Sequence, residues 1–206
     1  MNPKAMQKIS YGLFVLTTNL YKDNGCIINT AIQVTSEPNR ISIAVNKANL
    51  THDMVKESGE FNISVISEEA DFELFKRFGF QSGRSCGKFD DFSDYAYSPN
   101  GIAYVTKGVN AYISAKVVSS TDLGTHTLFI ADVTDMDIIS DAPSATYAYY
   151  HANIKPKPQT PPAEKTGKTI WRCTICGYEH EADELPADFI CPLCKHPATD
   201  FEKIER

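Results

Sequence analysis

Short apolar runs separated by polar turns fill residues 1–153 and predict a mainly β domain. Some runs are dense in β-branched and aromatic residues, and others alternate apolar with polar residues, which is typical of strands with one buried face. The runs cover residues 12–18, 26–34, 41–45, 61–66, 111–118 and 127–133. Helical spacing and capping residues predict short helices at 49–57 and 70–78. Many strands with few helices favour a closed or nearly closed β-barrel.

Residues 154–168 break this pattern and are typical of a linker. They contain four prolines and four lysines and almost no apolar side chains, a composition that favours an extended, semi-rigid spacer. We therefore divide the chain into a β domain over residues 1–153, this linker, and a small domain over residues 169–206. The small domain is too short to bury a core of its own, so we expect a metal to supply much of its folding free energy.

Two Cys-x-x-Cys pairs in the small domain give the strongest chemical signal of the chain. They are Cys173 with Cys176 and Cys191 with Cys194, and fourteen residues separate the two pairs. Each pair presents two thiolates to one ion, so together they predict a tetrahedral site of four sulfurs. The spacing alone does not choose the metal, because zinc ribbons, in which zinc only holds the fold, share it with iron sites that carry electrons.

Composition and charge limit the compartment and the partners. The chain has 206 residues, of which 42% are hydrophobic, and a formal net charge of −6. That charge argues against a nucleic-acid or phospholipid surface as the main partner, and no apolar run is long enough to span a membrane. The first residues lack the pattern of a secretory signal. Paired thiols in such a chain are typical of metal ligands rather than disulfides, so we expect a cytoplasmic protein.

Polar residues at strand ends and turns of the β domain mark a candidate ligand pocket. Hydroxyls and amides within 29–36 interrupt an apolar run and need partners if they are buried. Asn46 and Lys47 stand between a strand and a helix, where backbone amides and a lysine can hold a phosphate, and the turn at 82–84 adds an arginine. His126 begins another strand. Each feature also has a plain structural interpretation: a hydroxyl bonded to backbone, a helix cap, a surface arginine or a turn histidine.

Several of these segments, in the same order, resemble the flavin reductase-like family, whose fold is the FMN-binding split barrel. The matching segments are Tyr11–Thr18, Asn29–Ser36, Asn46–His52, Lys56–Phe61, Phe78–Arg84 and Gly124–Ile130. The resemblance implies a mainly β split barrel that binds FMN and forms a homodimer with the flavin near the interface. It implies flavin contacts at Asn29, Thr30, Thr35, Ser36, Asn46, Lys47, His52, Ser82, Gly83 and Arg84. His126 matches the histidine often placed near the nicotinamide, and is our candidate catalytic residue.

The small domain resembles a rubredoxin-like domain, with the short gap of the rubrerythrin type. Gly177, Pro192, the surrounding aromatic residues and the attached flavin domain favour iron over zinc. Joined to the barrel, this domain makes the chain resemble the high-molecular-weight rubredoxins, fusions of the NAD(P)H:rubredoxin oxidoreductase type found in anaerobic bacteria.

The double resemblance implies an enzyme that passes electrons from NADH or NADPH through FMN to one iron atom per chain, held by the four cysteines. A redox protein such as a flavodiiron oxygen or nitric oxide reductase is the implied acceptor. Two alternatives stay open. In the first, the chain is a flavin reductase whose tail is a structural zinc ribbon. In the second, it is a non-enzymatic electron carrier that a separate reductase supplies.

Overall fold

The computed structural model describes residues 3–156, 169–174, 178–192 and 196–204. The chain divides into two compact units, Met1–Ile154 and Lys155–Arg206. Most of the predicted linker lies outside the described residues. Within the described part of the chain, no helix combines the length and the apolar character needed to cross a bilayer.

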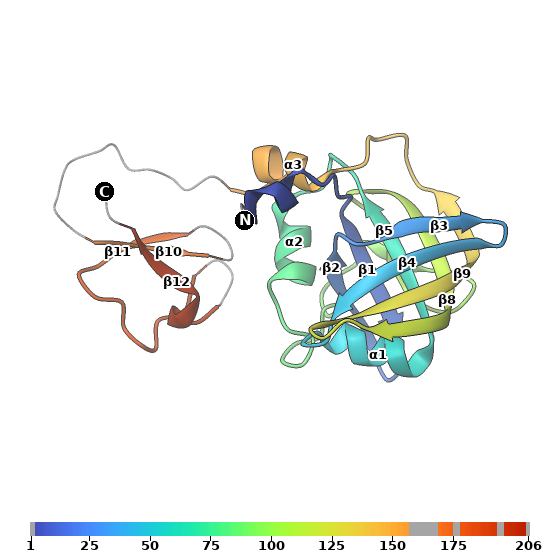
Figure 1. Cartoon of the computed structure of the whole chain (residues 1–206), viewed down its shortest axis with the longest axis horizontal. Coiled ribbons are helices and arrows are strands. Elements are labelled where there is room, and N and C mark those ends of the chain that lie inside the picture. The colour runs from blue at the N-terminus through green and yellow to red at the C-terminus, as the bar shows by residue number, and fades with distance from the viewer. Residues whose placement is uncertain (1–2, 157–168, 175–177, 193–195, 205–206) are drawn as a thin grey trace. The chain divides into compact units, whose positions relative to one another are not determined.

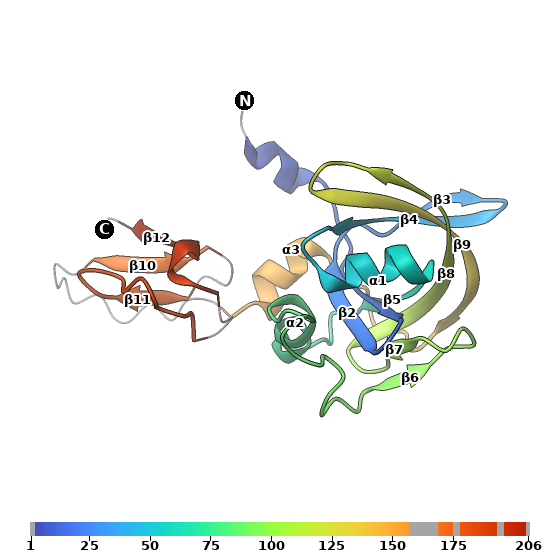
Figure 2. The same cartoon turned by 90° about the horizontal axis from the view of Figure 1, so that it is seen from below.

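A seven-stranded antiparallel sheet forms most of the first unit (Figure 1). Its strands lie in the order β2-β1-β5-β8-β9-β4-β3, and the sheet curls strongly on itself (Figure 2). The strands are β1 (Phe14–Asn19), β2 (Asp23–Ile28), β3 (Ile32–Ser36), β4 (Asn39–Asn46), β5 (Glu60–Ile66), β8 (Val109–Asp122) and β9 (His126–Ile138). A separate two-stranded ribbon pairs β6 (Tyr95–Tyr97) with β7 (Ala103–Val105). The predicted mainly β class is therefore confirmed.

The two main helices of the first unit lie within two residues of the ranges predicted for them. α1 (Leu50–Ser58) follows Asn49 and ends at Gly59, whose φ of 71° lets its N–H donate to the carbonyl of Val55. α2 (Phe72–Gly79) follows Asp71, whose carboxylate accepts the N–H of Leu74. Three short helical segments complete the unit: η1 (Pro3–Lys8), α3 (Tyr147–Tyr149) and the π-helical η2 (Tyr150–Ile154).

One hydrophobic core joins six strands of the sheet to α1. Its buried members are Leu16, Cys26, Ile28, Ile41, Ile43, Val45, Val55, Phe61, Ile63, Ala115, Phe129 and Ala131. Burying an aliphatic or aromatic side chain of this size contributes about 1.5–3 kcal/mol. Val55 holds α1 against this core, and the candidate site lies at the start of that helix.

A second core packs α2 against the sheet and the end of the unit. Its buried members are Leu13, Val15, Ile66, Ala70, Leu74, Phe75, Phe78, Val105, Val109, Ala145 and Tyr150. The rings of Phe75 and Tyr150 lie 4.4 Å apart, which anchors η2 on α2. Because α2 is held in this way, the loop that follows it starts from a fixed point.

The apolar run predicted over 26–34 is two strands rather than one. β2 ends at Ile28, and the chain turns through residues 29–31 before β3 begins. The hydroxyl of Thr30 causes part of this break, because its Oγ1 donates to the carbonyl of Ala44 (2.8 Å) and accepts the N–H of the same residue (3.1 Å). A side chain bonded to the backbone of β4 substitutes there for a continued strand ladder.

The structure also differs from the sequence prediction at β5, where both faces of the strand are buried rather than one. Its polar residues Asn62 and Ser64 are fully buried rather than solvent-facing. The amide of Asn62 donates to Ser98 Oγ (2.7 Å) and to the carbonyl of Ile102 (2.8 Å). Ser64 Oγ accepts the N–H of Val105 at 3.0 Å. A later segment of the chain thus covers the face that alternation alone assigns to water.

The second unit is a small three-stranded sheet with an aromatic interior. Its strands lie in the order β11-β10-β12: β10 (Ile170–Cys173), β11 (Glu179–Glu181) and β12 (Phe201–Ile204), with the 3-10 turn η3 (Ala198–Asp200) before β12. The ring of Phe189 lies 4.4 Å from that of His180 and 5.3 Å from that of Phe201. Trp171 Nε1 donates to the carbonyl of Ala182 at 3.1 Å.

Candidate functional site

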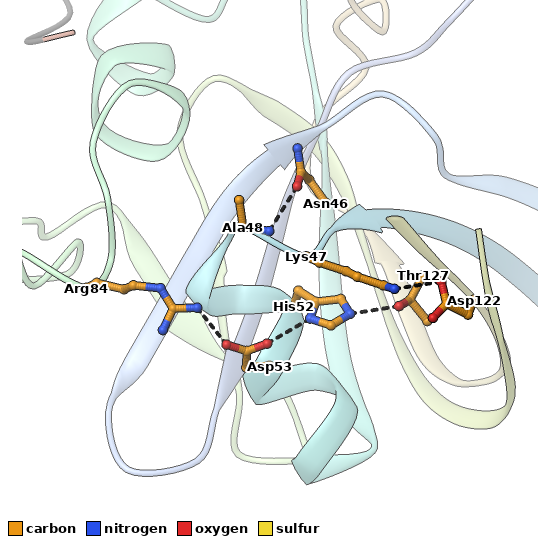
Figure 3. A network of polar contacts seen from close by, with 8 residues as sticks. All are labelled: Asn46, Lys47, Ala48, His52, Asp53, Arg84, Asp122 and Thr127. Carbon is orange, nitrogen blue, oxygen red and sulfur yellow. Dashed lines mark hydrogen bonds and ion pairs between the residues drawn. The ribbon is translucent and has the colours of Figure 1, made fainter. Parts of the chain in front are cut away.

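Three of the predicted segments meet at the N-terminal end of α1 (Figure 3). β4 ends at Asn46 and β9 begins at His126, and these two residues pair across the sheet. Lys47 follows directly, and its N–H donates to the carbonyl of Thr125 at 3.0 Å. Arg84 reaches α1 from the loop after α2, through an ion pair with Asp53. Sheet register and one ion pair thus bring together residues that lie far apart in the sequence.

His52 occupies the buried centre of this cluster. Its side chain is only 6% exposed, and its ring packs 5.9 Å from the ring of Phe129. Nδ1 lies 2.9 Å from Asp53 Oδ1, and Nε2 lies 2.8 Å from Thr127 Oγ1. Both ring nitrogens therefore have partners inside the protein. His52 ties α1 to β9 from within, instead of presenting a free nitrogen to a ligand.

The two cations of the cluster are each held by a carboxylate. Arg84 Nη2 lies 2.6 Å from Asp53 Oδ2, and Lys47 Nζ lies 2.6 Å from Asp122 Oδ1. Asn46 Oδ1 accepts the N–H of Ala48 at 2.9 Å, which closes the turn into α1. The hydrogen bond from Arg84, and then the one from His52, hold the pKa of Asp53 below its ordinary value of 3.8. Hydrogen bonds from Lys47 and from the N–H of Gly124 lower the pKa of Asp122 in the same way.

The lowered pKa of Asp53 predicts an acid-dependent contribution to folding. The ionised carboxylate favours the folded state above pH 3.8, and this contribution is lost as the pH falls through the lowered pKa. Asp53→Asn removes it at every pH. We therefore expect the variant to be less stable than the parent at pH 6 and the difference to shrink toward pH 3. Urea unfolding of both proteins at the two pH values measures this, and a difference that does not change with pH would contradict it.

Gly83 is required by a close approach between the loop after α2 and strand β2. A Cβ at this position would lie 2.3 Å from Asn24 Oδ1, which is closer than real Cβ atoms come. Lys22 Nζ donates to the carbonyl of Gly83 at 2.7 Å, so the loop is held on both sides. The amide of Asn24 donates to Thr51 Oγ1 at 3.0 Å, whereas its buried Oδ1 has no hydrogen-bond partner among the described residues.

Ser82 shapes the same loop from within. Its Oγ accepts the N–H of Arg84 at 3.2 Å, and its carbonyl accepts the N–H groups of Ser85 and Cys86. These bonds curl the backbone so that Arg84 points toward α1. Ser82 and Gly83 therefore position Arg84, which is the side chain of this segment that reaches the cluster.

A buried lysine, Lys88, fastens the far end of this loop. Its Nζ donates to the carbonyl of Phe78 at 2.9 Å, near the C-terminus of α2, where a cation is favourable. Burial lowers the pKa of Lys88 and raises the pKa of the Cys26 thiol. Cys86 is partly exposed, and its thiol lies 3.3 Å from the carbonyl of Ser82. We interpret this lysine as a structural anchor of the loop.

The predicted contacts on the β2–β3 segment have hydrogen-bond partners outside the polar network around α1. Asn29 and Thr30 lie in the turn between β2 and β3, and Thr30 is bonded to backbone. Thr35 Oγ1 donates to the carbonyl of Pro38, and Ser36 pairs with Asn39. All of β3 is exposed, and the strand extends away from α1 (Figure 1). Within one chain, the polar contacts described above join the α1 group of predicted residues and include none of these four.

Sequence reasoning missed four residues of the cluster: Asn24, Asp53, Thr127 and Asp122. Asp53 stands in the first turn of α1, where an acidic residue is usual because it complements the helix dipole. Thr127 looks like an ordinary β-branched strand residue, and Asp122 like a turn residue. Their roles depend on the pairing of β4 with β9, so only the register could have identified them.

Two of the four predicted metal ligands lie among the residues that the structure describes. Cys173 and Cys191 are completely buried in the second unit, whereas Cys176 and Cys194 lie outside the described residues. The N–H of Cys173 donates to the carbonyl of Tyr178, and the N–H of Cys191 donates to the carbonyl of His196, both at 2.8 Å. Two buried thiols, each with its backbone N–H bonded to the carbonyl five residues further on, fit a metal bound by thiolates.

Comparison with known proteins identifies the class of each unit. Residues 6–157 match the family model described as flavin reductase like domain, so the chain belongs to that family. Residues 171–202 match the rubrerythrin, rubredoxin-like domain. The predicted resemblance to both families is confirmed, and with it the expectation of an oxidoreductase.

Particular relatives match the whole chain or most of it. A high molecular weight rubredoxin from Moorella thermoacetica is 34% identical over 230 aligned residues, covering 99% of this chain and 100% of the relative. A ferric-chelate reductase (NAD(P)H) from Archaeoglobus fulgidus is 42% identical over 158 residues, covering 76% of this chain and 93% of the relative. The fold is similar to that of an NADH:FAD oxidoreductase from Streptomyces globisporus C-1027 in complex with NAD and FAD fragments. The TM-score is 0.62 at 19% identity, over 69% of this chain and 84% of that one.

Proposed function

We propose that the chain transfers electrons from NADH or NADPH, through bound FMN, to a single iron atom held by the four tail cysteines, and then to a separate redox protein. The observation that carries the proposal is the pair of cations, Lys47 and Arg84, gathered at the start of α1 beside His126. Similarity to a ferric-chelate reductase (NAD(P)H) supports the nicotinamide donor. Similarity to a high molecular weight rubredoxin supports the iron.

The flavin phosphate is the group that the α1 cluster suits best. The first-turn amides of a helix carry partial positive charge, and Asn49 makes no side-chain bond to them. Arg84 offers several N–H donors in one plane, and Lys47, which is paired with Asp122, adds a point charge. Gly83 keeps the loop close to β2, so that Arg84 approaches α1 at the height of its first turn.

The chain's own residues bind and orient, and the cofactors supply the redox chemistry. When bound, flavin exchanges two electrons with a nicotinamide, and thiolate-bound iron exchanges one at a time. We assign His126 to the nicotinamide, because it begins β9 opposite Asn46 and its Nδ1 is oriented by Thr125 Oγ1 at 2.9 Å. In the tail, the burial of Cys173 and Cys191 would keep water from a metal held there.

A homodimer is part of the proposal, with β3 of one copy completing the flavin site of the other. β3 carries the predicted contacts Thr35 and Ser36 and exposes Ile32 and Val34 at 63% and 45%. Apolar side chains on an exposed edge strand are typical of a subunit interface. We also propose the cytoplasm as the compartment, since reduced thiols are kept there, and a flavodiiron-type protein as the acceptor for the acidic tail.

Anaerobic stopped-flow mixing of the full chain with NADH and with NADPH tests the proposal. With FMN and iron bound, we expect the flavin absorbance to bleach first and the red iron–thiolate absorbance to follow. In FMN-free protein the iron absorbance should not bleach. Zinc in place of iron, in protein expressed with iron present, would support the flavin reductase with a structural ribbon. Absence of direct flavin reduction by both nucleotides would support the electron carrier.

His126→Ala is expected to slow flavin reduction about tenfold or more, because the nicotinamide loses a positioning group. The measurement is the limiting rate of flavin bleaching at saturating nucleotide. His151→Ala, the same change at an exposed position of η2, serves as the control and should keep the parental rate. Equal rates for the two variants would remove His126 from the nicotinamide site.

A further inference from the structure

An unbroken chain of polar contacts runs from the loop after α2, through α1, to β9 (Figure 3). Arg84 contacts Asp53 at 2.6 Å, Asp53 contacts His52 at 2.9 Å, and His52 contacts Thr127 at 2.8 Å. The two inner members are protected, since His52 and Thr127 are 4% and 6% exposed. The outer members, Asp53 and Arg84, have half-exposed side chains. The chain therefore connects the cation proposed for the phosphate to the strand that begins with His126.

We infer that Asp53 is a positioning residue of the flavin site, which holds Arg84 for the phosphate and fixes the proton arrangement of His52. The inference rests on the proposed function. Neither the family resemblance nor the predicted contacts include this residue. A carboxylate has two oxygens, so it can bind two partners at once. Oδ2 of Asp53 accepts from Arg84, and Oδ1 contacts His52.

The direction of every hydrogen bond in this chain follows from the carboxylate. An ionised Asp53 only accepts, so His52 Nδ1 must carry a proton and donate it. In the neutral imidazole Nε2 is then the acceptor, and Thr127 must donate its hydroxyl hydrogen to it. One carboxylate thus determines the tautomer of a buried histidine and the orientation of a hydroxyl next to His126.

Asp53 leaves Arg84 able to bind an anion at the same time. A guanidinium has five N–H donors, and the ion pair between Arg84 and Asp53 uses Nη2. With one edge held, the side chain loses rotamer freedom before the ligand arrives, which reduces the entropic cost of binding. The opposite view is that Asp53 competes with the phosphate and repels it. The two views predict opposite changes in FMN affinity when the carboxylate is removed.

Asp53→Ala in the full chain separates these views, with Asp132→Ala as the matched control. Asp132 pairs with Arg40 at the same 2.6 Å and is 42% exposed, but it belongs to β9 away from α1. FMN dissociation constants are measured by quenching of flavin fluorescence at fixed salt. We expect Asp53→Ala to weaken FMN binding about tenfold, because an arginine that is no longer held in place makes a poorer charged hydrogen bond to the phosphate. Asp132→Ala should bind as the parent does, and Asp53→Glu should recover part of the affinity.

Equal or tighter FMN binding by Asp53→Ala overturns the inference. If the parent itself does not bind FMN, the proposed function fails instead. The tautomer of His52, measured by NMR, then still tests the role of Asp53. Thermal unfolding of each variant shows whether it is folded. Should Asp53→Ala not fold, the FMN affinity of Asp53→Glu and the tautomer of His52 in the parent test the inference instead.

The tautomer of His52 gives a readout that a merely structural carboxylate would not move. Long-range ¹H–¹⁵N spectra distinguish a protonated Nδ1 from a protonated Nε2, and His52→Gln assigns the signal. We expect the Nδ1–H form in the parent at neutral pH. In Asp53→Asn the amide has a single oxygen, which Arg84 takes, so its NH₂ faces His52 and the Nε2–H form should appear. An Nε2–H form in the parent, or no change in the variant, would falsify the assignment.

Discussion

Replacing Cys191 by serine is expected to abolish native metal binding in the tail while the first unit keeps its affinity for flavin. Cys191 is completely buried, and its backbone N–H donates to the carbonyl of His196. Serine keeps the size of the side chain but removes a soft thiolate ligand. Structural metal sites of this kind supply about 10–16 kcal/mol to small domains. The variant tail should therefore lose its three-stranded sheet together with the metal.

Metal analysis and a visible spectrum of the variant measure the first effect, and an FMN titration measures the second. Cys173→Ser, at the other buried cysteine of the second unit, should behave in the same way. Cys86→Ser is the control, because this partly exposed cysteine belongs to the first unit, and it should keep a full complement of metal. Loss of FMN affinity in Cys191→Ser would contradict the division into two independent modules.

The fold of the first unit was predictable because its strands and helices are marked locally. Alternation and β-branched runs identified strands of the large sheet, although not the ribbon of β6 and β7. Capping residues and Gly59 marked the first helix, and the spacing of its phenylalanines marked the second. Two errors came from partners distant in sequence. Thr30 breaks one run by bonding to Ala44, and β5 is covered by a segment that follows it by some forty residues. Local patterns do not record such partners.

The candidate site was predictable only in part, for a related reason. The resemblance to a family selected Lys47, His52 and Arg84, and the structure gathers them at one end of α1. It could not show that His52 is enclosed, with both ring nitrogens in use. Nor could it single out Asp53, because a carboxylate in the first turn of a helix has an ordinary explanation in the helix dipole. Its two partners come from different parts of the chain.

Phe78→Ala is expected to cause the largest loss of stability in the first unit, about 3–5 kcal/mol. Phe78 is 1% exposed, and its ring meets those of Phe89 and Phe92 edge to face, each at 5.5 Å. Truncation leaves a cavity in the second core and removes both aromatic contacts. The carbonyl of the same residue accepts the bond from Lys88, so the loop that carries Arg84 starts beside this cavity.

Two measurements test the effects of Phe78→Ala. They are urea unfolding of the full chain, observed by circular dichroism, and the FMN dissociation constant under native conditions. Phe72→Ala on the same helix is the matched control, because its half-buried ring contacts Phe80 at 5.6 Å and lies outside the loop. We expect the control to lose about 1 kcal/mol and to bind FMN normally. Phe78→Ala should weaken FMN binding as well as folding, since a loosened loop no longer delivers Arg84 to α1. If the two variants bound FMN equally well, the loop would owe its conformation to Lys22 and Gly83 rather than to the core beneath it.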